Sequence, residues 1–210
     1  IEVQWVRSED VEEQGPERFL HSVSGIVVPG GFGSRGIEGM IETVRYAREH
    51  NVPYLGLCLG LQVMVIEVAR HLLGMKDANS TEFDPKTPNP VIDYMPDQKD
   101  ITQMGGTMRL GVYPCKLLDF EEESWASKAY GVPSIDERHR HRFEFNNRYR
   151  EELEAVGLWP TGISPDGRLV EIMEMSGLSF MVGVQFHPEF LSRPNAPHPL
   201  FREFVSVAKQ

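Results

Sequence analysis

The chain has 210 residues, of which 40% are hydrophobic and 25% are charged, and its net charge is −10. This is the composition of an ordinary globular protein, and the length suits one large domain. The acidic balance argues against a nucleic-acid-binding surface, and no stretch approaches the ~20 apolar residues of a membrane-spanning helix.

Two cysteines, Cys58 and Cys115, are too few for a disulfide framework in a chain of this size. We therefore expect reduced thiols and a cytoplasmic protein, because no basic and apolar leader is recognisable either. The expected partners are small polar metabolites or another protein, with no nucleic acid and no membrane.

The first part of the chain is predicted to alternate strands with helices. Apolar runs predict strands at 26–28 and 52–57, and alternation along the chain predicts a strand at 2–7. Helical spacing of apolar residues predicts helices at 16–22, 37–50 and 59–73, while the acidic stretch 8–15 resembles a loop. Such alternation is typical of an α/β fold with a mainly parallel central sheet and helices on both faces.

The remainder begins with a break in this pattern. Residues 74–108 are polar and rich in proline, which predicts a lid, a binding loop or a disordered segment. Strands are predicted at 111–117, 135–145, 158–164, 168–175 and 180–185, and helices at 149–156 and 199–209. Residues 119–123 resemble an acidic turn, and Pro165-Asp166-Gly167 predicts a hairpin. An additional small antiparallel strand region is also expected.

The stretch Gly56-Leu57-Cys58-Leu59-Gly60 is the most informative part of the chain. It places glycine two residues before and two residues after a cysteine, between an apolar run and a helical pattern. At a sharp strand-to-helix turn these two positions approach each other too closely to carry a Cβ. The layout predicts a nucleophile elbow with Cys58 at a helix N-terminus, where the helix dipole favours the thiolate. A buried core cysteine is the alternative.

A histidine and a glutamate follow the last apolar strand, in His187-Pro188-Glu189. In an extended backbone residues i and i+2 point the same way, so the two side chains are expected to touch. A cysteine nucleophile needs a base, and that base needs an orienting acid. We therefore predict a triad of Cys58, His187 and Glu189, with a structural role for His187 as the alternative.

A glycine-rich loop, Pro29-Gly30-Gly31-Phe32-Gly33, leaves the strand predicted at 26–28. The amide of Gly31, opposite that of Leu59, would form an oxyanion hole for acyl transfer. Residues 31–36 also match the dinucleotide fingerprint G-x-G-x-x-G, which needs an acid closing the next strand. That strand closes on Leu57 and Cys58 instead, so the oxyanion hole is favoured.

The stretch Arg138-His139-Arg140-His141-Arg142 would, as a strand, place two histidines on one face and three arginines on the other. So much positive charge disfavours a metal site, and no metal is expected. The planar fork of arginine suits an anion such as a carboxylate. A solvated or salt-bridged strand is the alternative.

Together, the motifs at 29–36, 56–62 and 185–189 resemble those of the class I, or triad, glutamine amidotransferases. Three further stretches, at 78–83, 104–111 and 138–143, resemble the glutaminase domains of the CTP synthase family. The likeness covers nearly the whole chain. It implies a flavodoxin-like α/β fold and one class I glutamine amidotransferase domain over 1–210.

This resemblance implies a reaction and a set of residues. Cys58 would attack the side-chain amide of L-glutamine, His187 would act as base and then protonate the departing ammonia, and Glu189 would orient His187. Glu82 is a partner for the α-ammonium of glutamine and Arg142 for its α-carboxylate. The full set implied to hold glutamine is Gly31, Leu59, Gly60, Leu61, Gln62, Glu82 and Arg142, with Gly31 and Leu59 as the oxyanion hole.

The resemblance also implies ligands and partners beyond this domain. CTP synthases carry a synthetase domain that uses ATP, UTP and Mg²⁺, and nothing in this sequence resembles it, so no cofactor is expected here. GTP is an expected allosteric activator, with Arg109 in the lid stretch 105–111 as a candidate contact. Family domains begin with one more strand and helix than we predict, and the full-length enzyme is expected to be a homo-oligomer.

Two other classes of function remain open. A cysteine-dependent γ-glutamyl hydrolase or peptidase on a related scaffold would keep Cys58 and His187 but would need an open cleft. Glu82 and Arg142 argue against it. A catalytically idle regulatory module is the third hypothesis, and the intact triad argues against that one.

Overall fold

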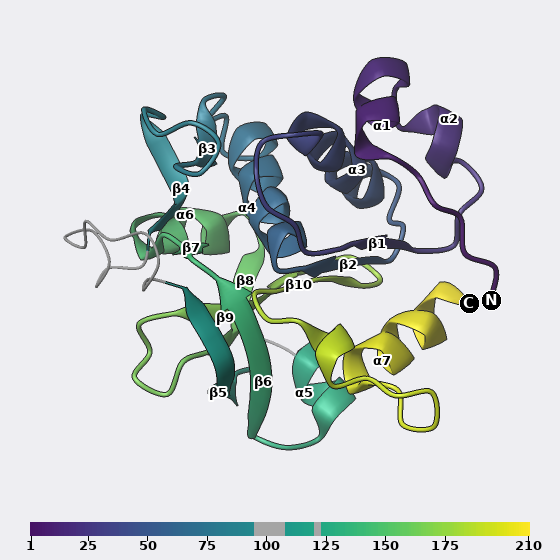
Figure 1. Ribbon diagram of the computed structural model, residues 1–210, viewed down its shortest axis with the longest axis vertical. Helices are drawn as coiled ribbons and strands as arrows, with labels where there is room; N and C mark the ends of the chain where they lie inside the picture. The colour runs from purple at the N-terminus through teal and green to yellow at the C-terminus, as the bar shows by residue number, and fades with distance from the viewer. Residues whose placement is uncertain (95–107, 120–122) are drawn as a thin grey trace.

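The computed structural model describes residues 1–94, 108–119 and 123–210 (Figure 1). None of the helices in these ranges is long and apolar enough to cross a membrane. The helices are α1 (Ser8–Gln14), α2 (Glu17–Leu20), α3 (Ile37–Glu49), α4 (Leu59–His71), α5 (Trp125–Tyr130), α6 (Arg150–Ala155) and α7 (Pro199–Ala208). The strands are β1 (Ile26–Val28), β2 (Tyr54–Leu57), β3 (Ala78–Ser80), β4 (Asn89–Tyr94), β5 (Arg109–Leu117), β6 (Ser134–His141), β7 (Phe143–Phe145), β8 (Leu158–Ile163), β9 (Val170–Met175) and β10 (Met181–Val184).

Seven strands form the central sheet in the order β1-β2-β10-β9-β8-β5-β6. Strand β2 is parallel to both of its neighbours, β1 and β10. The other neighbours are antiparallel, including β8 and β9, which the predicted hairpin turn joins. The α/β class is confirmed, and one detail is corrected: the described sheet is mixed, because parallel pairing is confined to β1, β2 and β10.

A smaller sheet in the order β3-β4-β7 lies beside the first. Strands β3 and β4 are parallel, whereas β4 and β7 are antiparallel. A small second strand region is therefore present as predicted, but it is mixed rather than antiparallel, and two of its strands come from the segment 74–108 that was predicted as a loop. Residues 95–107 of that segment and 120–122 of the predicted acidic turn lie outside the described residues.

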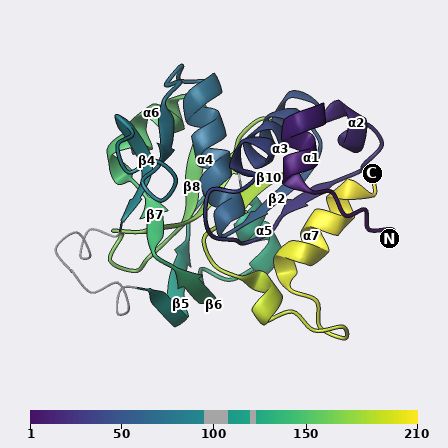
Figure 2. The ribbon, with the colours of Figure 1, turned by 45° about the horizontal axis from the view of Figure 1, so that its top comes forward.

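Helices cover both faces of the central sheet, with α1, α3 and α4 on one side and α5 and α7 on the other (Figures 1 and 2). Alternation along the strands decides which core each side chain joins. Tyr54 and Met181 pack into the core beneath α3 and α4, and Leu55 and Val182 into the core beneath α5 and α7. The strands that carry the site are thus buried on both faces.

The N-terminal segment differs from the prediction. Residues 2–7 form no strand, and Val3 and Trp5 are exposed. A strand needs a hydrogen-bonded neighbour, and the described edge of the sheet is formed by β1. The predicted loop at 8–15 is helix α1, which packs on α3 at Gly39, where an added Cβ would lie 1.8 Å from the backbone oxygen of Ser8. Helix α5 was also not predicted.

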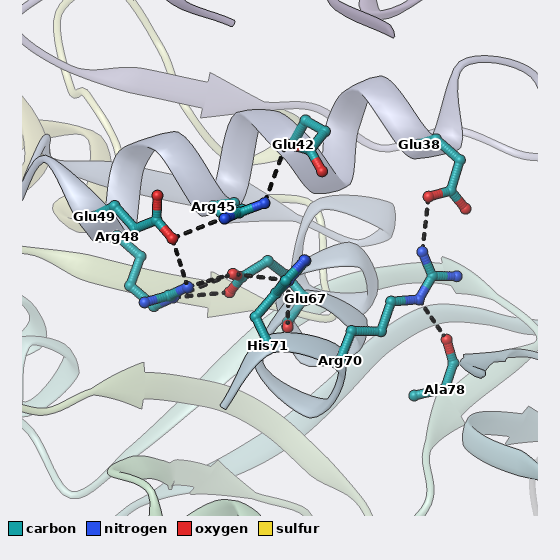
Figure 3. Close-up of polar contacts among 9 residues, drawn as sticks. All are labelled: Glu38, Glu42, Arg45, Arg48, Glu49, Glu67, Arg70, His71 and Ala78. Atoms are coloured by element: carbon teal, nitrogen blue, oxygen red, sulfur yellow. Dashed lines mark hydrogen bonds and ion pairs between the residues drawn. The ribbon is translucent and has the colours of Figure 1, made fainter. Parts of the chain in front are cut away.

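An ion-pair network joins α3 to α4 (Figure 3). Glu67 of α4 is fully buried, and Arg48 of α3 donates to both of its carboxylate oxygens at 2.7 and 3.0 Å. His71 lies 3.2 Å from the same carboxylate. Arg70 of α4 binds Glu38 at 2.7 Å and the backbone oxygen of Ala78 at 2.8 Å, which ties α4 to β3. The network holds in place the helix that begins directly after Cys58.

Candidate active site

Cys58 occupies a strained turn between β2 and α4, with φ of 51° and ψ of −96°. Non-glycine residues rarely adopt positive φ, so the surroundings must hold this conformation. The Cys58 amide donates to the Val184 oxygen at 2.7 Å. A Cβ on Gly56 would lie 2.5 Å from the carbonyl carbon of Gly60, and a Cβ on Gly60 would lie 2.3 Å from the Val28 oxygen. The predicted elbow geometry is confirmed.

The imidazole of His187 is bound to Glu189, with 2.6 Å between Nδ1 and Oε1. The predicted contact is confirmed, although its backbone differs, since Pro188–Phe190 forms a turn of 3₁₀ helix. The Phe190 ring stacks on the imidazole at 4.8 Å between centroids. These two contacts leave Nε2 of His187 buried without a hydrogen-bond partner among the described residues.

The side chains of Cys58 and His187 both lie close to Gly30. A Cβ added to Gly30 would lie 2.6 Å from Cε1 of His187 and 3.4 Å from Cβ of Cys58. Both side chains therefore crowd against the same point of the glycine loop, and only glycine leaves them room. The structure places the predicted nucleophile, base and glycine loop at one end of the parallel strands.

A cavity of about 310 Å³ opens beside Cys58. Of the residues expected to hold glutamine, Gly31, Gln62, Glu82 and Arg142 line it. Its full lining is Gly31, Phe32, Cys58, Gln62, Glu82, Met108, Arg140, His141, Arg142 and Phe143. This volume and this mixture of polar and aromatic walls are typical of a site for a small molecule.

Three residues of the expected set lie behind the cavity wall. Leu61 is fully buried in the core. Gly60 packs on Val28, and its oxygen accepts a hydrogen bond from Tyr54 at 2.9 Å. The side chain of Leu59 is also buried, but its backbone amide faces the sulfur of Cys58. Leu59 therefore remains the candidate for one oxyanion-hole donor.

Burial raises the pKa of the Cys58 thiol to about 12. The Leu59 amide lowers this pKa, whereas the carboxylates of Glu144, Glu189 and Glu82 raise it further. From its position at the helix N-terminus we expected the Cys58 pKa to be lowered. In the structure, the loss of hydration on burial raises this pKa by more than the helix position lowers it. The thiol therefore needs a base that removes its proton, and His187 would be that base.

Glu82 and Arg142 both line the cavity, and each lies in a connecting segment, Glu82 between β3 and β4 and Arg142 between β6 and β7. Glu82 accepts a hydrogen bond from the Gly33 amide at 2.9 Å, which ties it to the glycine loop. Nε of Arg142 is buried and has no partner among the described residues. Opposite charges on the walls of a small cavity suit a zwitterion such as an α-amino acid.

Two of the three arginines at 138–142 lie on β6. Arg138 and Arg140 are exposed there, whereas His139 and His141 are buried, so the predicted alternation is present, and Arg140 also lines the cavity. Arg142 lies beyond the end of β6, in the break before β7. Its side chain lines the cavity, as that of Arg140 does, but its Nε is buried, whereas Arg140 is exposed.

A cluster of charged and polar side chains is buried behind the cavity. Nη1 of Arg109 lies 2.7 Å from Glu171 and 3.6 Å from Glu144. Nδ1 of His139 lies 2.9 Å from Nε2 of His141. Burial and Arg109 lower the pKa of His139 to about 2 and that of His141 to about 3, so both imidazoles are neutral. Arg109, the residue expected at a GTP contact, is buried and pairs with the carboxyl groups of Glu144 and Glu171.

One buried residue at the site received no role from the sequence. Gln185 follows β10, and its side-chain amide donates to the sulfur of Cys58 at 3.7 Å. The two residues are 127 positions apart in the chain. The pairing of β10 with β2 brings them together, and no local pattern signals that pairing.

The fold and the site together define a class of protein, in which an α/β sheet carries a cysteine at an elbow beside a histidine and a glutamate. The family profile "Glutamine amidotransferase class-I" matches residues 1–207. The chain therefore belongs to the class I glutamine amidotransferase family.

Within that family the similarity is to CTP synthases. The CTP synthases of Dehalococcoides mccartyi and Roseiflexus castenholzii are 61% and 62% identical over 210 and 211 residues, which is all of this chain and 38% of each relative. The glutaminase domain of Trypanosoma brucei CTPS, solved with bound acivicin, superposes with a TM-score of 0.92 at 37% identity. The match covers 99% of this chain and 80% of that one.

A more distant solved structure shares the fold alone. A putative GMP synthase protein from Thermoplasma acidophilum has a TM-score of 0.58 and is 17% identical, over 99% of this chain and 89% of that one. The resemblance to the glutaminase domain of CTP synthase therefore rests on the closer relatives, and they confirm it.

Proposed function

We propose that this chain hydrolyses L-glutamine to glutamate and ammonia through a thioester on Cys58. The observation that carries the proposal is the cavity at the elbow, which joins Cys58 to Glu82 and Arg142 on its walls. Glu82 would bind the α-ammonium and Arg142 the α-carboxylate. This would direct the side-chain amide of glutamine toward the sulfur.

In the proposed mechanism, His187 removes the thiol proton and the sulfur attacks the amide carbon. The amides of Gly31 and Leu59 would stabilise the resulting oxyanion. Protonated His187 then gives its proton to the leaving nitrogen, so that ammonia departs and the thioester forms. His187 next removes a proton from water, which attacks the thioester, and glutamate leaves with the thiol restored. Glu189 would hold the imidazole in the required orientation throughout.

We further propose that the ammonia serves the amination of UTP to CTP in a synthetase domain, with ATP and Mg²⁺ bound there and GTP as an allosteric activator. The support is that the relatives named CTP synthase are much longer than this chain, which spans 38% of their length. A homo-oligomer of the full-length enzyme belongs to the same proposal.

A test of the glutaminase activity needs two readouts. The purified chain is incubated with L-glutamine, or with an electrophilic glutamine analogue, and glutamate release is followed together with the mass of the Cys58 peptide. Label on Cys58 with glutamate release supports the proposal. Label without turnover would indicate a formed site in need of its partner, and the absence of both label and turnover would refute the proposal for this chain.

The matched control is the other cysteine. Cys115 is fully buried in the opposite core, so the Cys115→Ala variant should keep both label and turnover, whereas Cys58→Ala should lose both. A γ-glutamyl peptide distinguishes the alternative hydrolase or peptidase. If that peptide is cleaved faster than free glutamine is, the alternative replaces the proposal.

A further inference from the structure

Gln185 is fully buried and its side chain reaches the candidate nucleophile. Val184 of β10 pairs with Leu57 of β2, so the next residues of the two strands, Gln185 and Cys58, are neighbours at the strand ends. The Gln185 side-chain nitrogen donates to the sulfur at 3.7 Å, within the range of a hydrogen bond to sulfur. The backbone amide of Gln185 donates to the backbone oxygen of Glu171 at 2.8 Å, which holds Gln185 in place.

Gln62 decides which end of the Gln185 amide faces the sulfur. Nε2 of Gln62 donates to the Phe143 oxygen at 3.2 Å and to Oε1 of Gln185 at 3.4 Å. Because Oε1 of Gln185 accepts this bond, its NH₂ group is the end that points to Cys58. The two glutamines thus form a directed chain of donors from α4 to the sulfur.

We infer that Gln185 is a positioning residue for the nucleophile: its amide donates to the Cys58 sulfur and stabilises the thiolate, and Gln62 fixes the direction of that amide. This inference rests on the proposed role of Cys58. The sulfur is buried and lies near three carboxylates, so a thiolate formed there needs donors to replace water. The Leu59 amide is one donor and Gln185 supplies another.

The test measures the rate constant of Cys58 alkylation at one fixed, mildly alkaline pH by chloroacetamide, a small neutral reagent, in the Cys115→Ala chain. Gln185→Met has similar length but cannot donate, and Gln185→Glu places a carboxylate beside the sulfur. A hydrogen bond to a charged group is strong enough to change the thiol pKa by about one unit, so its loss in the methionine variant should slow alkylation about tenfold. The glutamate variant should slow it further, and Gln62→Met less.

A purely structural role of Gln185 would change stability but not the alkylation rate constant. Thermal unfolding is therefore recorded alongside, and unchanged rate constants in folded Gln185→Met and Gln185→Glu chains would overturn the inference. If both variants fail to fold, the side-chain amide NMR signals of Gln185 in the Cys115→Ala chain supply the test. They should differ from those of a chain that also carries Cys58→Ser, and identical signals would also overturn the inference.

The chosen reagent separates this inference from the proposed function. Chloroacetamide carries neither the ammonium nor the carboxylate of glutamine, so its reaction does not depend on Glu82 or Arg142. Failure of glutamine hydrolysis by the parent chain together with slower alkylation in the Gln185 variants would refute the proposed function and leave the role of Gln185 intact. Hydrolysis by the parent chain together with unchanged alkylation in those variants would do the reverse.

Discussion

Cys58 combines two features that oppose each other at the level of a single residue. Its backbone is held in a strained turn that presents the sulfur to the cavity, while burial raises the pKa of its thiol to about 12. The nearby carboxylates add to this rise in pKa. Reactivity near neutral pH therefore depends on the groups that take the proton and that donate to the sulfur.

The contact between Glu189 and His187 yields the first prediction. In Glu189→Gln the orienting carboxylate is lost while the shape of the side chain is kept, so the imidazole is less firmly held in the required orientation. We expect kcat for glutamine hydrolysis to fall about 100-fold, within the usual range for loss of acid–base catalysis. The measurement is steady-state glutamate release. Glu154→Gln, remote from the cavity, is the control, and equal rates in the two variants would remove Glu189 from the mechanism.

Arg142 yields a second prediction at the same scale. Its guanidinium is the proposed partner of the α-carboxylate, so Arg142→Met should raise KM for glutamine about 10- to 100-fold, the cost of a lost hydrogen-bonded charge. Arg138→Met is the matched control, because Arg138 points outward from the neighbouring strand. An unchanged KM in Arg142→Met, measured by the same glutamate assay, would contradict the assignment.

At the scale of elements, the position of α4 governs the elbow at its N-terminus. The buried Glu67 joins α4 to α3 through Arg48, and this contact is shielded from water (Figure 3). Exposed ion pairs contribute little to stability, whereas removing one partner of a buried pair leaves an uncompensated charge. The two helices therefore depend on this pair more than on the surface pairs beside it.

A third prediction follows from this difference. Arg48→Met should lower the free energy of unfolding by about 3 kcal/mol, since it leaves the Glu67 carboxylate buried without its main partner. The control is Arg45→Met on the same helix, where the half-exposed pair with Glu49 is lost at a cost of under ~1 kcal/mol. The free energy of unfolding of both variants is measured in urea. Similar losses of this free energy in the two variants would show that burial of Glu67 is unimportant.

At the scale of the whole molecule, the cluster behind the cavity joins β5, β6, β7 and β9. Two carboxylates, Glu144 and Glu171, share the guanidinium of Arg109, and the neighbouring His139 and His141 are neutral. Burial raises the pKa of both carboxyl groups, and their mutual repulsion raises that of Glu144 further, although Arg109 opposes the rise. The folded protein therefore holds protons that the unfolded chain releases.

The fourth prediction concerns pH and stability. Below the ordinary carboxyl pKa both states are protonated, and as pH rises above it the unfolded chain loses its protons first, so the free energy of unfolding falls. Glu144→Gln removes one such group, which faces Arg109, His141 and Glu171. Between pH 5.5 and pH 8 the variant should gain about 1 kcal/mol relative to the parent in urea unfolding. Parallel pH profiles for variant and parent would contradict this account.

The local parts of the fold could be predicted because periodicity is a property of neighbouring residues. Helix α3 and strand β2 lie within a few residues of their predicted bounds, and the elbow glycines marked the turn at Cys58. The segment 2–7 was predicted wrongly, because an alternating pattern forms a strand only where a neighbour is present to pair with it. Helix α1 was missed because its packing on Gly39 of α3 is not visible in its own sequence.

By itself, the sequence determined the α/β class from alternating patterns, the elbow cysteine and the pairing of His187 with Glu189 from short motifs, and Glu82 and Arg142 as candidate binding residues from the family resemblance. Only the tertiary structure decided the mixed sheet, the place of Arg142 in the cavity wall, the burial of Arg109 and the contact of Gln185 with Cys58. These features depend on strand order, register and desolvation. They are set by residues far apart in the chain, and no local pattern encodes them.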